Sequence, residues 1–448
     1  MERPGPVLII CHDVVGPHMA GPGIRYTALA QELSREFPVV LAAPEGSTWK
    51  ADAPFRFVTY RLSEDQALAQ EAQAARAILI PALWLTHFPG LQESETPLVI
   101  DGYDPFVAET LALGGDERPI QEALALAYAR GDFFICASER QRDWWLGLLE
   151  ASGRVNRAVF QDDPSLRRLV DVVPYGLPEE PPVQTRPVVK GVWPGIAPQD
   201  RVILWGGGLW PWLDPLTAIR AMARLWPVRQ DLRLIFPGTR HPNPEMAQTP
   251  NHVEAARELA RELGLLDRAV FFGEWIPFQD WPNVLLESDV ALSLHLDSLE
   301  TRLAFRSRVL DTIWAGLPVV TTRGDATSEL IERYRLGVVT DYQDADGVAQ
   351  AILGLLETPR SQLEPRFQEA RAALTWSRAC RPLMAFCRRP RPAADRAQGT
   401  SRPIPSPCQE ETDPLEQRIR ELEALVAGYE RGRFIRSMAW IKQRLGRA

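Results

Sequence analysis

The feature that most constrains the fold is a local order that occurs twice in the chain: an apolar run, a loop that carries glycine, and a helical pattern. The first copy begins with the apolar run 7–11 and leads to a helical pattern over 24–35. The second begins with 201–205, passes through three consecutive glycines and enters a helix at Asp214, a good N-terminal cap. Parallel strands need a crossover, usually a helix, to reach their neighbours, so this order is typical of α/β proteins.

Further short apolar runs continue the strand rhythm in both halves, and some are separated by helical patterns over 122–130 and 140–149. The runs lie at 38–43, 77–80, 97–100, 133–136, 169–173, 232–236, 269–272, 290–294, 318–321 and 337–340. The periodicity stops at the proline-rich stretch 179–187, which is typical of an interdomain linker. The sequence therefore predicts two doubly wound parallel-sheet α/β domains in tandem, at residues 1–178 and 179–388.

Charge and cysteine content exclude several classes of function. In 448 residues, 58 acidic side chains outnumber 50 basic ones, and the net charge of −8 argues against nucleic acid as the main partner. Only Lys50, Lys190 and Lys442 are lysines, so an anion site must use arginine, helix N-termini or backbone amides, and no lysine-dependent phosphate loop occurs. The five cysteines contain no C-x-x-C pair, which fits neither a disulfide framework nor a zinc site. With no signal-peptide pattern and no long apolar run, we expect a cytoplasmic protein.

The composition changes near residue 389. Residues 389–414 are rich in proline and arginine with almost no apolar periodicity, and predict a disordered linker. A helical tail is predicted over 415–448, and its last part, 431–448, carries six basic residues and no acid, with one apolar stripe. Such a helix is typical of a peripheral contact with an anionic membrane. Packing against the body or against a second copy through 415–426 is the alternative.

Two glycine loops are candidate binding sites. In the first, Gly21, Gly23 and Arg25 lie where a helix N-terminus offers amides to an anion or to an acceptor hydroxyl. Its length, and Tyr26 at the position of a third glycine, argue against a dinucleotide-binding turn and hence against an NAD-dependent oxidoreductase. The alternative is a mobile loop without a ligand.

The second loop, with Gly206, Gly207 and Gly208, leaves bare amides at the mouth of the second sheet. Trp210 and Trp212 beside it fit either a ligand contact or a core anchor.

A third group of residues gives the strongest evidence of a binding site. After the run 290–294 come His295 and Glu300, and a helix predicted over 305–315 begins with Arg306 and Arg308 and contains Asp311. Two arginines at a helix N-terminus oppose the helix dipole unless an anion binds there. Arginine suits phosphate oxygens and carboxylates suit sugar hydroxyls. A surface salt-bridge network among these four charged residues is the alternative.

Together these motifs resemble the family 4 group of GT-B glycosyltransferases over residues 5–388. The resemblance rests on 19–25, 138–143, 173–177, the glycine triplet and, most specifically, Glu300 to Asp311 followed by Gly-Leu-Pro-Val-Val. It implies two Rossmann-like domains facing a central cleft, with the nucleotide-sugar donor held mainly by the second domain and the acceptor mainly by the first. It also implies transfer with retention of configuration and without a metal ion.

The resemblance assigns roles residue by residue. Asp311 matches the second acid of the family's E-x7-E motif, which binds the donor ribose, and Glu300 would be the first acid, facing the donor sugar and phosphate. Eleven positions separate these two acids, whereas the family has eight, and the position eight before Asp311 holds Leu303. Because the family's usual basic residues are absent from the glycine loop, Arg306 and Arg308 would neutralise the diphosphate.

Other residues match the family's pattern less closely. Trp275 would flank the base, although a core position explains it equally well. Asp101 and Asp104 occupy the region near the transferred sugar, with His12, His18 and His87 as weaker candidates.

The sequence thus predicts a cytoplasmic, peripheral, retaining glycosyltransferase. It would move a sugar from a nucleoside diphosphate to a glycan or lipid-linked acceptor in cell-surface polysaccharide or glycoconjugate synthesis, without a cofactor, and a homodimer could form through the tail. The alternative is a non-catalytic protein that binds sugar nucleotides or glycans on the same fold.

Overall fold

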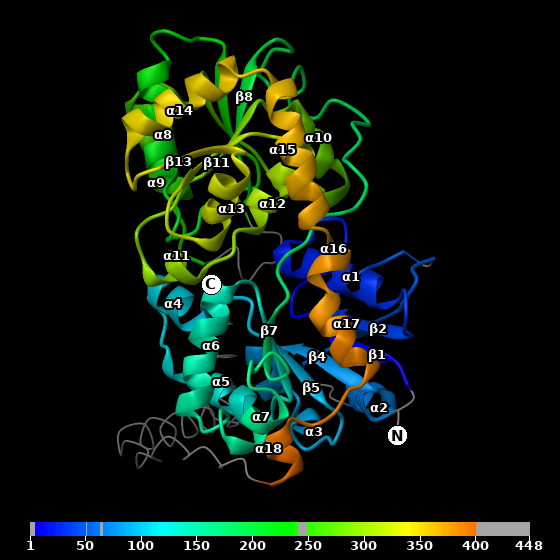
Figure 1. Cartoon of the computed structure of the whole chain (residues 1–448). Helices are drawn as coiled ribbons and strands as arrows, with labels where there is room; N and C mark the ends of the chain where they lie inside the picture. Colours follow the sequence, from blue (N-terminus) through cyan, green and yellow to red (C-terminus); the bar gives the residue numbers. More distant parts are fainter. Residues whose placement is uncertain (1–4, 51, 63–65, 241–248, 400–448) are drawn as a thin grey trace, which may run out of the picture. The chain divides into compact units, whose positions relative to one another are not determined.

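Two all-parallel β-sheets, one in each half of the chain, organise the computed structural model, which describes residues 5–50, 52–62, 66–240 and 249–399 (Figure 1). The first sheet has the order β3-β2-β1-β4-β5-β6-β7. Its strands are β1 (Val7–Ile10), β2 (Val39–Pro44), β3 (Arg56–Tyr60), β4 (Ala77–Pro81), β5 (Leu98–Asp101), β6 (Phe133–Cys136) and β7 (Val170–Val172). The central strands are buried on both faces, as expected where helices cover both sides of a parallel sheet.

The second sheet has the order β10-β9-β8-β11-β12-β13. Its strands are β8 (Arg201–Trp205), β9 (Leu232–Phe236), β10 (Val270–Phe272), β11 (Val290–Ser293), β12 (Val319–Thr322) and β13 (Gly337–Thr340). In each sheet the strand order reverses beside the first strand, between β1 and β4 and between β8 and β11. Open α/β sheets bind ligands outside the carboxyl ends of the strands at such a reversal.

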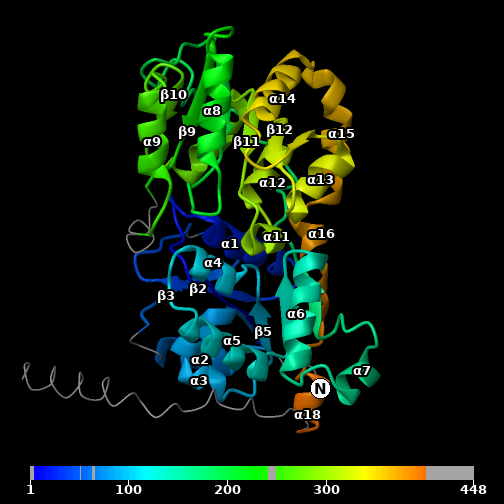
Figure 2. The ribbon, with the colours of Figure 1, turned by 90° about the vertical axis from the view of Figure 1, so that its left-hand side faces the viewer.

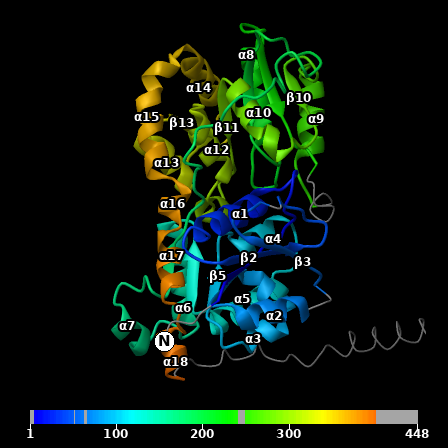
Figure 3. The ribbon, with the colours of Figure 1, turned by 90° about the vertical axis from the view of Figure 1, so that its right-hand side faces the viewer.

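Helices cover both faces of each sheet (Figures 2 and 3). The longer helices of the first half are α1 (Gly21–Leu33), α5 (Arg118–Arg130) and α6 (Glu139–Ala151), and the short α4 (Phe106–Ala112) precedes α5. The second half has α8 (Pro215–Leu225), α9 (Val253–Glu262), α10 (Trp281–Glu287), α11 (Leu299–Leu303), α12 (Ser307–Ala315), α13 (Ala326–Tyr334), α14 (Ala345–Glu357) and α15 (Arg360–Ala373). Helices α8 and α14 pack together on one face of the second sheet, and α10 and α12 pack on the other. The predicted pair of doubly wound domains is therefore confirmed.

The chain returns to the first domain at its last described helices, α16 (Trp376–Ala379), α17 (Arg381–Arg388) and α18 (Ala394–Ala397). The ring of Phe386 stacks on that of Phe133 at 4.9 Å, and Arg388 forms an ion pair with Glu36 at 2.6 Å. Residues 376–388, which the sequence analysis assigns to the second domain, thus pack on the first.

The predicted disordered linker over 389–414 is wrong over residues 389–399. Asp395 of α18 is fully buried and forms an ion pair with the equally buried Arg154 at 2.7 Å, while Arg396 pairs with Asp132 at 2.6 Å. Ion pairs rather than an apolar stripe hold this segment, so apolar periodicity gave no signal for it. The rest of the linker and the helical tail predicted over 415–448 lie outside the described residues. No helix in the described part of the chain is long and apolar enough to cross a membrane.

Candidate active site

The glycine triplet and Arg308 meet at the carboxyl end of β8. Gly207 has φ +95°, and a Cβ there would lie 3.2 Å from Nη2 of Arg308, so the bare backbone makes room for the guanidinium. Both terminal nitrogens of Arg308 are 3.4 Å from the carbonyl oxygen of Gly208, and the guanidinium lies 6.0 Å from the ring centre of Trp205. The loop between β8 and α8 and the first turn of α12 therefore bring bare backbone and one guanidinium to the same place.

The charge of Arg308 is poorly compensated within the protein. Among the described residues, none of the carboxylates lies within salt-bridge distance of it. Burial and the neighbouring Arg306 lower the pKa of Arg308 to about 9. Burial raises the pKa of Asp311, one turn further along α12, to about 7, although it accepts a hydrogen bond from Nε1 of Trp281 at 3.0 Å. Arg308, in the first turn of α12, thus lacks a paired carboxylate among the described residues to balance its charge.

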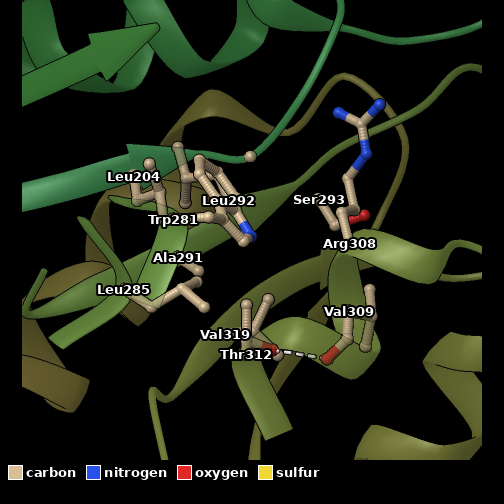
Figure 4. A pocket seen from close by; sticks show the side chains of 11 residues that line it. Leu204, Trp281, Leu285, Ala291, Leu292, Ser293, Arg308, Val309, Thr312 and Val319 are labelled. Carbon is tan, nitrogen blue, oxygen red and sulfur yellow. Dashed lines mark hydrogen bonds between the residues drawn. The ribbon is translucent and has the colours of Figure 1, made fainter. Parts of the chain in front are cut away.

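A narrow pocket lies beside Arg308 (Figure 4). Its walls are mainly apolar side chains of β8, β11, α10 and α12, and Gly206, Ser293 and Trp281 contribute to its lining. Ser293 is 2% exposed, and within the described structure its hydroxyl has no hydrogen-bond partner. An unpartnered buried hydroxyl beside an uncompensated guanidinium indicates a place for a polar ligand group or water.

His295, two residues along from Ser293, is fully buried at the strand reversal. Its Nε2 lies 3.0 Å from the carbonyl oxygen of Arg323, so this nitrogen carries the proton and donates. Burial lowers the pKa of His295 to about 4, which keeps the ring neutral. Nδ1 is then an acceptor, and no described group donates to it.

Glu300 and Arg306 form a buried bidentate pair. The carboxylate oxygens of Glu300 lie 2.7 and 2.6 Å from Nη1 and Nη2 of Arg306, and Asp325 lies 3.6 Å from Nε. The anion expected beside these helix-start arginines is, for Arg306, the protein's own carboxylate. The ion-pair alternative therefore explains Glu300 and Arg306, although the pair is buried rather than on the surface, and it does not extend to Arg308 or Asp311.

In the first domain, Arg25 and Asp101 are held in a structural pair. Nε of Arg25 lies 2.8 Å from Asp101, and Nη2 donates to the carbonyl of Val173 at 2.9 Å. Gly23 is required for packing, because a Cβ there would lie 2.8 Å from that of Met19. A Cβ on Gly21 would lie 3.8 Å from Oγ of Ser307, so this glycine faces the start of α12.

Asp104 is the less constrained acid of the first domain. Burial, followed by the charge of Asp101, raises its pKa to about 7. Glu109 of α4, which sequence reasoning missed, has a pKa raised well above its usual range by burial and then by Asp104 and Glu300. The acids of the first domain therefore lie near Glu300 of the second.

Trp275 packs against the backbone after β9, because a Cβ on Gly238 would lie 3.0 Å from its ring. Sequence reasoning missed Trp281 and Ser293, whose roles depend on contacts between β11, α10 and α12. The only available signal was the position of Ser293 at the carboxyl end of a predicted strand. In the described part of the chain, no three His, Cys, Asp or Glu side chains are grouped to share a metal ion.

Comparison with known proteins agrees with this architecture. Residues 200–358 match the family model "Glycosyl transferases group 1". A chitobiosyldiphosphodolichol beta-mannosyltransferase from Debaryomyces hansenii is 29% identical over 98 residues, which is only 21% of this chain and 20% of that protein.

Solved structures extend the likeness to both domains. Sucrose-phosphate synthase from Thermosynechococcus elongatus is 15% identical with a TM-score of 0.60, covering 86% of this chain and 98% of that one. HepE from Anabaena, solved in complex with UDP and glucose, is 15% identical with a TM-score of 0.61, covering 85% and 98%. The chain therefore has the GT-B fold, and its residues 200–358 match the glycosyl transferases group 1 family.

Proposed function

We propose that this protein is a retaining glycosyltransferase whose donor is a nucleoside diphosphate sugar. The observation that carries the proposal is Arg308: a half-buried guanidinium without a carboxylate partner among the described residues, set on a glycine loop where the strand order reverses. A diphosphate supplies the missing negative charge, and arginine binds its oxygens in a fork geometry. The group 1 domain match and the UDP complex of HepE support a nucleotide-bound donor.

The reaction follows from where the charges lie. The bond between the anomeric carbon and the diphosphate oxygen breaks, and the acceptor oxygen bonds to the same carbon from the same face. Negative charge grows on the leaving diphosphate, where Arg308 and the amides of the glycine loop stabilise it. The acceptor proton passes to the departing diphosphate. We propose that this transfer needs no metal ion, which an unchanged rate in the presence of EDTA would test.

Asp311 is proposed to accept hydrogen bonds from the donor ribose, and Trp275 to flank the base. Ser293 and His295 are proposed to complete the polar lining, through the unpartnered hydroxyl of Ser293 and the unpartnered Nδ1 of His295. Asp104 is proposed to lie near the acceptor hydroxyl, because its pKa of about 7 lets it exchange a proton near neutral pH.

One observation favours the non-catalytic alternative. Both carboxylate oxygens of Glu300 are engaged by Arg306, and the aligned position holds Leu303, so neither supplies a free acid to the donor sugar. A protein that binds a sugar nucleotide without turning it over would retain Arg308 and Asp311 and need no such acid.

Donor hydrolysis tests the two functions directly. The protein is incubated with UDP-, GDP- and dTDP-sugars, and release of nucleoside diphosphate is followed, with Arg308→Met as the matched control. Hydrolysis of one donor by the native protein and not by the variant supports the transferase. Tight binding of a donor without turnover supports the binding protein. If the protein neither binds nor hydrolyses any donor, both functions are overturned.

We further propose peripheral membrane attachment on the cytoplasmic side through residues 431–448, so that the enzyme reaches a glycan or lipid-linked acceptor used in cell-surface polysaccharide or glycoconjugate synthesis. Six basic side chains and no acid support it, each contributing about 1 kcal/mol near an anionic surface. Truncation after Arg402 spares the packed segment 389–399 and should abolish sedimentation with anionic vesicles. Dissociation of a dimer on truncation, without vesicle binding by the full chain, would make the tail an assembly element.

A further inference from the structure

Side chains of the first domain bind the end of α11 in the second. Helix α11 has five residues, so the carbonyl groups at its C-terminal end have no hydrogen-bond donors within the helix itself. Arg302 and Leu303 carry two of these carbonyls, and Phe305 carries another in the connection to α12. Each accepts a hydrogen bond from a side chain of the first domain.

Gln141, in the first turn of α6, makes the most complete of these contacts. Its Nε2 donates to the carbonyl of Tyr103 at 2.6 Å and to that of Leu303 at 2.8 Å, while its Oε1 accepts from the amide of Ala137 at 2.6 Å. Gln141 is 2% exposed. Both amide hydrogens and the amide oxygen are used, which fixes the orientation of this side chain.

Two neighbours reinforce the contact. Arg140 donates to the carbonyls of Arg302 and Gly324 and pairs with Glu329 of α13. The hydroxyl of Tyr103 donates to the carbonyl of Phe305 at 3.1 Å, and their rings meet edge to face at 6.3 Å. The first domain therefore contacts the second at the end of α11 and within the α11–α12 connection.

The α11–α12 connection joins Glu300 to the two arginines at the start of α12. Glu300 lies in α11, Arg306 caps the start of α12, and Arg308 follows in the first turn. A shift of Leu303 relative to α6 would move the Glu300 to Arg306 pair, and with it the start of the helix that carries Arg308. Displacement of such groups by about 1 Å is enough to cost up to about 100-fold in rate.

We propose that Gln141 is a positioning residue, which holds the α11–α12 connection against the first domain and thereby sets the Glu300 to Arg306 pair, and Arg308 beside it, in place for transfer. This inference rests on the proposed transferase function. Gln141 itself does not touch the donor. Its effect passes through the carbonyl of Leu303.

Two substitutions separate the contact of Gln141 with Leu303 in the second domain from its hydrogen bond with Ala137 in the first. Gln141→Glu keeps an oxygen for the amide of Ala137 but loses both amide donors, whereas Gln141→Met loses all three hydrogen bonds. Arg142→Met is the matched control: Arg142 lies next along α6, is 8% exposed, and donates only within the first domain, to the carbonyls of Val170 and Ser165. The readouts are amide hydrogen exchange over 299–308 without substrate, and kcat with the donor identified by the hydrolysis screen.

We expect both Gln141 variants to increase exchange over 299–308 and to lower kcat about tenfold or more, with a smaller change in donor KM. Arg142→Met should lower the melting temperature while leaving exchange over 299–308 and kcat unchanged. Unaltered exchange in Gln141→Glu, or equal effects of all three variants, would overturn the positioning role. If the native protein turns over no donor, the proposed function fails, and the exchange experiment still decides whether Gln141 orders the connection.

Discussion

Arg25 and Arg308 each lie beside a glycine loop at the carboxyl edge of a sheet, one in each domain, yet their surroundings differ. Arg25 is bound by Asp101 and by the carbonyls of Val173 and Pro174. Burial opposes its charge, but the charge and hydrogen bonds of Asp101 raise the pKa of Arg25 above the usual range. Arg308 reaches one carbonyl at 3.4 Å, and its pKa is lowered to about 9. The arginine of the first domain is thus paired within the fold, whereas that of the second has no carboxylate partner among the described residues.

The largest expected effect is on stability, from Arg25→Met. The substitution leaves the carboxylate of Asp101 buried without its partner, and breaking a buried pair in this way costs about 3–5 kcal/mol of unfolding free energy. Chemical denaturation measures this loss. In the double variant Arg25→Met with Asp101→Leu, much of it should return, because the unpaired charge is gone. A single variant as stable as the native protein would mean that Arg25 does not hold the fold.

Arg308→Met should show the opposite behaviour. Removing a half-buried charge that no carboxylate compensates should leave the melting temperature unchanged or raise it, while donor affinity falls by about 1.5–3 kcal/mol, or roughly 10- to 150-fold in Kd. Calorimetry with UDP, GDP and dTDP measures the affinity. Arg306→Met is the comparison: because it leaves Glu300 unpaired, it should lower stability in the manner of Arg25→Met. Loss of stability without loss of affinity in Arg308→Met would remove the distinction between the two domains.

Sequence reasoning identified the two sheets because their evidence is local: apolar runs bounded by glycine loops and helix caps. Asp214, predicted as an N-terminal cap, accepts from the amide of Thr217 at 3.0 Å. Helix boundaries were less exact, since the predicted helix over 305–315 is α12 (Ser307–Ala315) preceded by the separate α11. A backbone break between Glu300 and Arg306 leaves no mark in the apolar pattern.

The pairing of charged side chains with one another could not be predicted in the same way. The charges at 300, 306, 308 and 311 were all visible, but which arginine is bound by which acid depends on how α11 turns back on α12. Segment 389–399 shows the same limit, because its order depends on Arg154, which is distant in sequence. The donor-site roles given to Asp311, Trp275 and the glycine triplet remain predictions.

Asp311 offers a smaller test of the second domain. Its carboxylate must be ionised to accept a strong hydrogen bond from a ribose hydroxyl, and its pKa is about 7. Donor affinity of the native protein should therefore increase as the pH rises through about 7. Asp311→Asn should bind the donor more weakly, by up to about 1.5–3 kcal/mol, and should lose this pH dependence. Calorimetry at pH values on both sides of this pKa tests the assignment, and a parallel pH response in the variant contradicts it.

The smallest expected effect separates Asp104 from its paired neighbour Asp101. Burial and then Asp101 and Glu300 raise the pKa of Asp104 to about 7, against the opposing charges of Arg25 and Arg306. A carboxyl with a raised pKa binds its proton more tightly in the folded state, so its contribution to stability is present below the unfolded pKa of about 4 and is lost as the pH rises toward the folded pKa. Asp104→Asn, which cannot ionise, should therefore match the native protein near pH 4 and melt a few degrees higher above pH 7. Asp143→Asn, at an exposed position on α6, is the control and should leave the melting temperature unchanged across this range. If Asp104→Asn instead destabilises the protein at high pH, the ionised carboxylate is bound as firmly as that of Asp101, and the first domain has no acid available to an acceptor at this position.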